Sequence, residues 1–292
     1  MAKLVIEKYQ KSISMAYRGI NLSTFFRYYL KHKGLQKMNV EKYTDINAKT
    51  IDKWVEDDWI WGRPISHETY LKALNDDWNV LLTPLKFVPK SWFPVLKDKK
   101  LLGLASGGGQ QMPIFSAQGA ICTVLDYSDK QLASERLVAD REGYKIEIVK
   151  ADMTEKLPFS DCSFDIIFHP VSNCYIEDVC HVWMECFRIL KHGGVLLTGF
   201  DNGLNFLFDE DSDSPLTIAN KLPFNPLKNR DHYEMLAKNN DGIQFSHSLE
   251  EQIGGQLKAG FILKDLYEDY NEEGLLKDYV PTFIATLSLK PL

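Results

Sequence analysis

Three consecutive glycines between an apolar segment and a polar one are the residues best suited to hold a ligand. Segment 100–111 reads Lys-Leu-Leu-Gly-Leu-Ala-Ser-Gly-Gly-Gly-Gln-Gln, so the glycines follow a short predicted strand and precede a helix start. Glycine lacks a Cβ, which lets the backbone approach a ligand closely, and a helix start offers unpaired N–H groups. On its own the loop leaves two interpretations open, a cofactor-binding turn and a tight chain reversal.

Acidic residues end the two apolar segments that come next. Segment 120–125 runs into Asp126, about 20 residues after the loop, and segment 146–151 runs into Asp152. An acid at that distance from a glycine loop holds the ribose diol in doubly wound folds. Because the carboxyl ends of parallel strands meet at one edge of the sheet, these carboxylates predict a site for a nucleoside cofactor.

A histidine ends the fourth apolar segment, 164–168, and is the candidate general base. His169 lies where the reacting group of the cofactor is expected, and the pKa of an imidazole suits proton transfer at neutral pH. A structural imidazole bonded to backbone, or one that contacts the cofactor, is the alternative. Asn173 and Tyr175 follow closely and are candidates to orient an acceptor, or residues that only satisfy the loop.

Two further motifs connect these segments. Segment 157–165, Leu-Pro-Phe-Ser-Asp-Cys-Ser-Phe-Asp, precedes the fourth strand, and segment 188–194, Arg-Ile-Leu-Lys-His-Gly-Gly, leads into a fifth. With the glycine loop and the two acids, in this order, they make residues 101–200 resemble the class I S-adenosylmethionine-dependent methyltransferases. The chain is particularly similar to the small-molecule group that includes the ubiquinone and menaquinone biosynthesis methyltransferases.

The resemblance implies S-adenosyl-L-methionine as the cofactor and a set of residues that holds it. By position, the outer glycines of the loop pack against the methionine part, the acid after strand two holds the ribose hydroxyls, and the Asp152-Met153 pair holds adenine. The family has an acid where this chain has Gly103, so the contact to the cofactor's amino group is expected from elsewhere or from a backbone carbonyl. The expected cofactor contacts are Ala105, Ser106, Gly107, Gly109, Asp126, Tyr127, Asp152, Met153 and His169.

The fold that the resemblance implies is an α/β, doubly wound, Rossmann-like sheet of seven strands. The expected strand order is 3-2-1-4-5-7-6, with the last strand antiparallel, and residues 261–267 and 282–289 are the expected strands six and seven. Residues 177–190 are expected to form an amphipathic helix between strands four and five.

The expected methyltransferase domain spans residues 100–292 and carries an insertion at 201–260. The insertion begins with an acidic segment, 209–215, which is expected to be a solvated loop. It ends with a helix over residues 248–259 that Ser248 caps and Gly260 stops. In the family, insertions after strand five often form the substrate side of the pocket.

Two regions precede the glycine-loop strand. Residues 1–39 form a basic, helical arm: residues 1–37 hold eight Lys/Arg and one acid, a charge of +7, which leaves −13 for the rest of the chain. The arm is expected to pack on its own body or on a neighbouring subunit, so a homodimer is one outcome, and a membrane-surface or partner-binding helix is the alternative. Residues 40–99 hold five of the six tryptophans and are expected to form a helical cap. In that cap Trp54 and Trp61 either roof a substrate pocket or only add buried aromatic area.

Composition excludes several other classes. The net charge of −6 repels phosphate backbones, so no nucleic-acid partner is expected. Five cysteines without paired spacing predict reduced thiols, a cytoplasmic location and no metal site, and no apolar run is long enough to span a membrane. A nicotinamide dehydrogenase is disfavoured because Met112 stands where its glycine motif needs a small residue.

Together these features predict an S-adenosylmethionine-dependent methyltransferase that acts on a small-molecule acceptor. Transfer from a sulfonium needs mainly alignment in a dry site, so a base is required only if the acceptor must lose a proton. The acceptor atom stays open. Two alternatives are a catalytically silent S-adenosylmethionine-binding protein and a nucleic-acid methyltransferase that uses the basic arm.

Overall fold

The computed structural model describes residues 41–208 and 217–292. The chain divides into two units between residues 42 and 43, and the architecture below is that of residues 43–292. The expected basic arm (1–39) and the expected acidic loop (209–215) lie outside the described residues.

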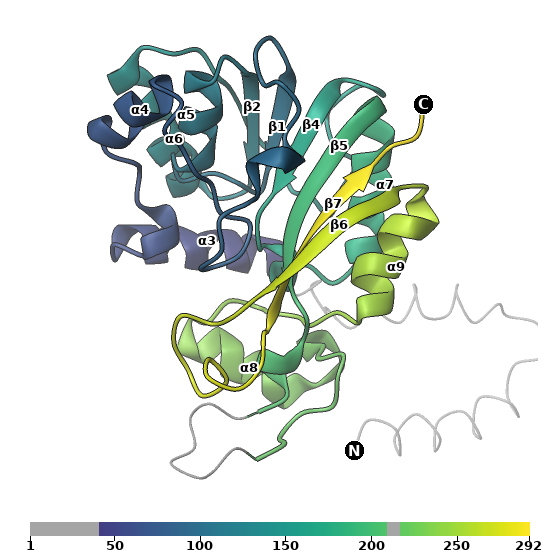
Figure 1. Ribbon diagram of the computed structural model, residues 1–292. Helices are drawn as coiled ribbons and strands as arrows, with labels where there is room; N and C mark the ends of the chain where they lie inside the picture. The colour runs from purple at the N-terminus through teal and green to yellow at the C-terminus, as the bar shows by residue number, and fades with distance from the viewer. Residues whose placement is uncertain (1–40, 209–216) are drawn as a thin grey trace, which may run out of the picture. The chain divides into compact units, whose positions relative to one another are not determined.

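A seven-stranded sheet forms the centre of the unit, in the order β3-β2-β1-β4-β5-β7-β6. β7 pairs antiparallel with both β5 and β6, whereas the first five strands run parallel (Figure 1). The strand order and the antiparallel seventh strand predicted from the sequence are therefore confirmed. The strands are β1 (Lys100–Leu104), β2 (Ile121–Asp126), β3 (Glu147–Lys150), β4 (Phe164–His169), β5 (Leu190–Asp201), β6 (Ile262–Asp269) and β7 (Phe283–Leu289).

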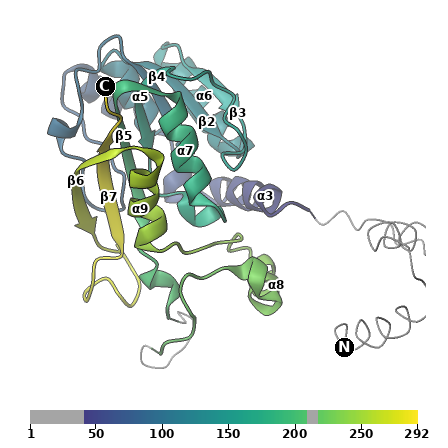
Figure 2. The ribbon, with the colours of Figure 1, turned by 90° about the vertical axis from the view of Figure 1, so that its right-hand side faces the viewer.

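Helices cover both faces of the sheet. α5 and α6 lie on one face, and α7 and α9 lie together on the other, while α3 crosses below the sheet in Figure 1 (Figures 1 and 2). The helices are α3 (Tyr43–Glu56), α4 (His67–Leu74), α5 (Gln111–Ala117), α6 (Asp129–Glu142), α7 (Val179–Ile189), α8 (Arg230–Asn239) and α9 (Leu249–Ala259). Short 3₁₀ turns are η1 (Ile60–Gly62), η2 (Lys90–Trp92), η3 (Asn173–Tyr175), η4 (Leu204–Phe206) and η5 (Pro226–Lys228).

The central strands β1 and β4 are mostly apolar because their side chains alternate between two buried faces. Leu101 packs into the cluster on the α5 face, and the next residue, Leu102, packs into the cluster with α7. Both side chains are fully buried. Neighbouring strands follow the same alternation, which explains why the sequence shows continuous apolar runs.

Caps define the ends of the helices that border the site. The Ser128 hydroxyl accepts a hydrogen bond from the backbone N–H of Gln131 at the start of α6. Ser248 and Glu251 form a capping box at the start of α9, and Gly260 ends that helix in the left-handed conformation. The predicted cap and stop of this helix are confirmed. α9 packs against α7 and β6, so this end of the expected insertion belongs to the helical layer of the fold.

Residues 78–96 of the N-terminal region pack against the sheet. Trp78 and Trp92 are buried in the same apolar cluster as Leu101. Gly199 in β5 permits this approach, since a Cβ there would lie 2.1 Å from the carbonyl oxygen of Leu82. These two tryptophans therefore stabilise the core.

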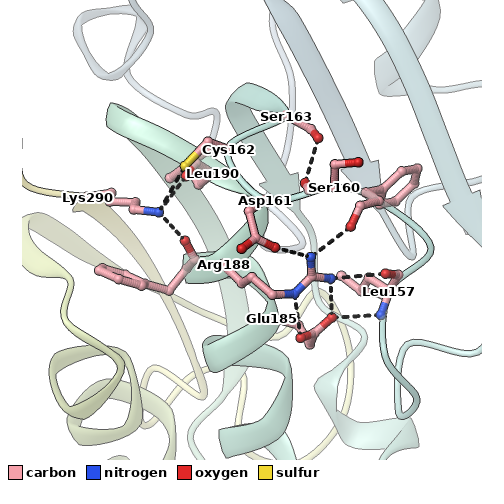
Figure 3. Close-up of polar contacts among 11 residues, drawn as sticks. Leu157, Ser160, Asp161, Cys162, Ser163, Glu185, Arg188, Leu190 and Lys290 are labelled. Carbon is pink, nitrogen blue, oxygen red and sulfur yellow. Dashed lines mark hydrogen bonds and ion pairs between the residues drawn. The ribbon is translucent and has the colours of Figure 1, made fainter.

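The segment that leads into β4 is held by one arginine (Figure 3). Arg188, in the last turn of α7, pairs with Glu185 at 2.6 Å and with Asp161 at 2.9 Å. Its guanidinium also donates to the backbone carbonyls of Leu157 and Phe159. The two methyltransferase-like motifs at 157–165 and 188–194 thus contact each other and fix the approach to β4.

Candidate functional site

A cavity opens at the carboxyl edge of the sheet, below the ends of β1 to β4. Helix α3, Trp59, Trp61, residues 81–84 and residues 170–172 and 174–176 supply other parts of its wall. It brings together most of the residues that the sequence singled out. Those in its lining are Ala105, Ser106, Gly107, Asp126, Tyr127, Asp152, Met153, Trp61 and Tyr175.

The glycine loop is pressed against the first half of α6. A Cβ at Gly107 would lie 3.0 Å from the Asp126 carboxylate and 2.7 Å from the Gln131 Cβ. Gly109 has a φ of +67° and faces Val138 of α6, and it does not line the cavity. Close packing on α6, as well as room for a ligand, therefore requires glycine in this loop.

A buried glutamate of α6 holds the same loop. Glu135 is fully buried; its carboxylate accepts hydrogen bonds from the Gly109 N–H at 3.1 Å and from the Tyr144 hydroxyl at 3.1 Å. Burial raises the pKa of Glu135 to about 7, and the two hydrogen bonds oppose that shift. No pattern in the sequence distinguishes this residue, because it lies nine positions after Asp126 within an ordinary helix.

Asp126 organises the end of β2. One carboxylate oxygen accepts from the N–H groups of Tyr127 and Ser128, and the other accepts from the N–H of Gly107 at 3.0 Å. Burial raises the pKa of Asp126, and these backbone hydrogen bonds act in the opposite direction. The second oxygen keeps acceptor capacity on the cavity side, which is where a ribose hydroxyl would need it.

Asp152 and Tyr127 are held by neighbours on the same edge. Asp152 accepts from the backbone N–H and the hydroxyl of Thr154, and the Tyr127 hydroxyl donates to Asp45 of α3 at 2.6 Å. Their orientations are therefore fixed before a ligand binds.

Helix α3 closes the cavity and was not singled out from the sequence. Thr44, Asn47, Ala48 and Ile51, at helical spacing, line the cavity. Asn47 is buried and bonds the carbonyls of Tyr175 and Ile243 and the N–H of Ile243.

A second anchor of α3 reaches the start of α6. Asp52 accepts from the Ser128 hydroxyl and from the backbone N–H of Lys130. Together with Asn47, it joins α3 to the start of α6 and to residues 175 and 243, and neither contact could be read from residue spacing.

His169 lies outside the cavity. Its side chain is fully buried, with Nδ1 2.8 Å from the Leu104 carbonyl oxygen and Nε2 2.8 Å from the Asn173 side-chain oxygen. Asn173 in turn donates to Gln252 of α9 and does not line the cavity either. Burial lowers the pKa of His169, which disfavours the imidazolium. This placement corresponds to the structural alternative, because both ring nitrogens are engaged inside the protein.

Trp54 also lies outside the main cavity. Its indole N–H donates to the Asn240 carbonyl, and its ring packs against Trp59 and Tyr175. With Asp57, these aromatic residues line a shallow neighbouring depression. Trp61, by contrast, is part of the main cavity wall.

The wall beyond β4 is mostly apolar. It includes Leu81, Leu82, Pro84, Val171 and Phe283, which come from three distant parts of the chain. Cys174 and Tyr175 border it; burial raises the pKa of the Cys174 thiol to about 12 and that of the Tyr175 hydroxyl well above its ordinary value. Both groups are therefore neutral near pH 7.

The donor set of the cavity fits S-adenosylmethionine. Carboxylates at the ends of β2 and β3 suit hydroxyl and amino groups of a nucleoside, and the cradle at Gly107 has no space that a side chain could occupy. Two buried oxygens in the cavity-lining residues, Thr44 Oγ1 and Gln131 Oε1, have no hydrogen-bond partner among the described residues. Both atoms are sealed from solvent, so a ligand could bond to them only after a local shift of the side chains that cover them.

An open seven-stranded sheet of this order, with its last strand antiparallel and carboxylates at its carboxyl edge, is the class I methyltransferase fold. A family model described as a methyltransferase domain matches residues 102–198. The methyltransferase YbaJ of Bacillus subtilis (strain 168) is 42% identical over 249 residues, which cover 84% of this chain and 97% of the relative. The chain therefore belongs to the class I S-adenosylmethionine-dependent methyltransferases, and S-adenosyl-L-methionine is its cofactor.

Two solved structures share the fold at low sequence identity. An S-adenosylmethionine-dependent methyltransferase from Mesorhizobium loti superimposes with a TM-score of 0.55 at 19% identity, covering 68% of this chain and 94% of that one. A putative methyltransferase of the same type from Listeria monocytogenes gives a TM-score of 0.53 at 15% identity, with 70% and 96% covered.

Within residues 41–208 and 217–292, no helix is long and apolar enough to cross a membrane. Over the same residues, no cluster of three His, Cys, Asp or Glu side chains is arranged to hold a metal ion.

Proposed function

We propose that this enzyme methylates a small, largely apolar acceptor that binds beside the cofactor in the same cavity. The observation that carries the proposal is the continuity of the cavity from the cofactor residues Asp126 and Asp152 to the apolar wall at Leu82, Val171 and Phe283. A concave, apolar wall favours a small molecule that fits entirely inside the cavity. The acidic net charge also disfavours a polyanionic acceptor.

The residues would contribute binding, orientation and exclusion of water. S-Adenosylmethionine, when bound, supplies a methyl group that is already activated on a sulfonium. Asp126 and Asp152 hold the nucleoside, and the apolar wall holds the acceptor against the methyl-donating end. α3 keeps water out, which strengthens every polar contact inside. Tyr175 stays protonated, so its hydroxyl adds no charge to the acceptor side of the cavity.

The test is release of S-adenosylhomocysteine across a panel of neutral aromatic and aliphatic metabolites, with transfer RNA and oligonucleotides as the competing class. We expect turnover with one chemical group of the panel and none with nucleic acid. Phe283→Ala should then raise KM for that acceptor and leave the dissociation constant of S-adenosylhomocysteine unchanged. Turnover with nucleic acid, or an acceptor KM that no wall substitution alters, would overturn the proposal.

A further inference from the structure

The position of the family acid, Gly103, is filled by another side chain. A Cβ at Gly103 would lie 2.6 Å from the sulfur of Met112 and 3.2 Å from the Ser106 Cβ. Met112 is fully buried, so the space beside β1 has no room for a carboxylate. Another polar group must face the part of the cofactor that lies over the end of β1.

Ser106 and Gln111 are the polar side chains at that place. The Ser106 hydroxyl donates to the Gln111 side-chain oxygen at 3.2 Å. Ser106 is 3% exposed and Gln111 is 8% exposed, and both line the cavity. This bond fixes the Gln111 amide, because its oxygen is committed to the serine.

The amide nitrogen of Gln111 is left open. This nitrogen has no hydrogen-bond partner among residues 41–208 and 217–292. It is also not fully buried, unlike the unpartnered Thr44 and Gln131 oxygens. A polar atom that is neither bonded nor sealed is reachable by a ligand, here from the cavity that Gln111 lines. Two N–H donors therefore face the ligand from a largely buried side chain.

Strand order says which part of the cofactor they face. β3 and β2 carry Asp152 and Asp126, so the adenine and ribose lie over that side of the sheet. β1 is the next strand, and β4 beyond it borders the apolar wall. The part of the cofactor that follows the ribose, the homocysteine or methionine chain, thus lies over the end of β1, where Ser106 and Gln111 are.

We propose that Gln111, held by Ser106, binds the carboxylate of the cofactor's amino-acid end through its amide N–H groups. The donors match a carboxylate, which accepts hydrogen bonds through both oxygens. Gln111 is a binding and positioning residue, and the inference does not depend on the nature of the acceptor.

The test compares two ligands by calorimetry. S-Adenosylhomocysteine carries the amino-acid end, and 5′-methylthioadenosine has the same nucleoside and sulfur without it. Gln111→Leu should weaken the binding of S-adenosylhomocysteine about tenfold or more, because hydrogen bonds to a charged group are lost. The affinity for methylthioadenosine should not change. Gln110→Leu is the matched control: the amide of Gln110 donates to the carbonyls of Ile60 and Arg63, so any effect should be equal for both ligands.

Two more variants keep the proposal falsifiable if Gln111→Leu fails to fold. Ser106→Ala should weaken the binding of S-adenosylhomocysteine, by less than Gln111→Leu does, and should leave the binding of methylthioadenosine unchanged. Gln111→Glu should weaken it further, because two carboxylates would meet. The proposal is overturned if both ligands lose affinity equally, if S-adenosylhomocysteine binds each folded variant as well as the parent, or if Gln111→Glu binds it more tightly.

Discussion

The two halves of the cavity are built in different ways. The half proposed to hold the cofactor is formed by the ends of β1, β2 and β3: Asp126 is the last residue of β2, and Asp152 lies two residues after β3. The half proposed to hold the acceptor combines α3, residues 81–84 and Phe283, and its lining residues lie up to 239 positions apart in the chain. One half depends on local chain geometry, whereas the other depends on tertiary packing of segments outside the family motifs.

This difference affects what each half tolerates. In the cofactor half, backbone N–H groups fix the carboxylate of Asp126, so its geometry follows from the turn after β2. In the acceptor half, Asn47 fixes a helix to loops more than 120 residues away. Changes to the first half should alter cofactor binding, and changes to the second should first alter stability and acceptor selection.

The largest effect is expected at Asp126. Asp126→Ala removes the carboxylate proposed to accept a hydrogen bond from the ribose hydroxyl. It should weaken the binding of S-adenosylhomocysteine by about 1.5–3 kcal/mol, measured by calorimetry. Asp129→Asn is the control, since Asp129 lies nearby at the start of α6, is exposed, and pairs with Lys150. Unchanged affinity in a folded Asp126→Ala protein would contradict the assignment of this half.

A smaller effect on stability is expected from α3. Asn47→Leu leaves two buried carbonyls and one N–H without their partner and should lower the free energy of unfolding by about 1–3 kcal/mol, measured with urea. Lys53→Leu on the exposed face of the same helix is the control. If Asn47→Leu lowered cofactor affinity without changing the unfolding midpoint, the separation of the two halves would be wrong.

The sequence predicted one half much better than the other. The position of Asp126 follows from apolar runs and glycine spacing, which are local signals, and the strand order follows from the family resemblance that these motifs carry. His169 follows a strand just as Asp126 does, yet its ring turns inward to the Leu104 carbonyl, because side chains at strand ends face either side. Trp61 and Trp54 lie in the same tryptophan-rich segment, so the sequence does not distinguish them. Only tertiary packing places Trp61 in the cavity wall and Trp54 in the neighbouring depression.

A pH-dependent effect is expected at Glu135, below the glycine loop. The folded pKa of about 7 lies above the ordinary value, so the folded protein holds a proton more tightly, and stability should fall as the pH rises from 4.5 to 7. Glu135→Gln keeps an acceptor for the Gly109 N–H and removes the titration. Its unfolding free energy should exceed that of the parent by about 1–2 kcal/mol at pH 8 and match it near pH 4.5. A difference that does not vary with pH would show that Glu135 does not titrate in this range.

The smallest effect is expected from removal of residues 1–37. The described wall of the cavity begins at Thr44, and residues 43–292 form a compact unit. We therefore expect a chain that starts at Met38 to melt cooperatively and to bind S-adenosylhomocysteine with unchanged affinity. The removed segment carries +7 against −13 for the remainder, so an attraction between them would be weakened by salt, and the melting temperature of the full chain should depend more on salt than that of the shortened one. Loss of cofactor binding in a shortened chain that still melts cooperatively would place part of residues 1–37 in the site. The cavity would then have a third component besides the strand ends and the segments brought together by tertiary packing.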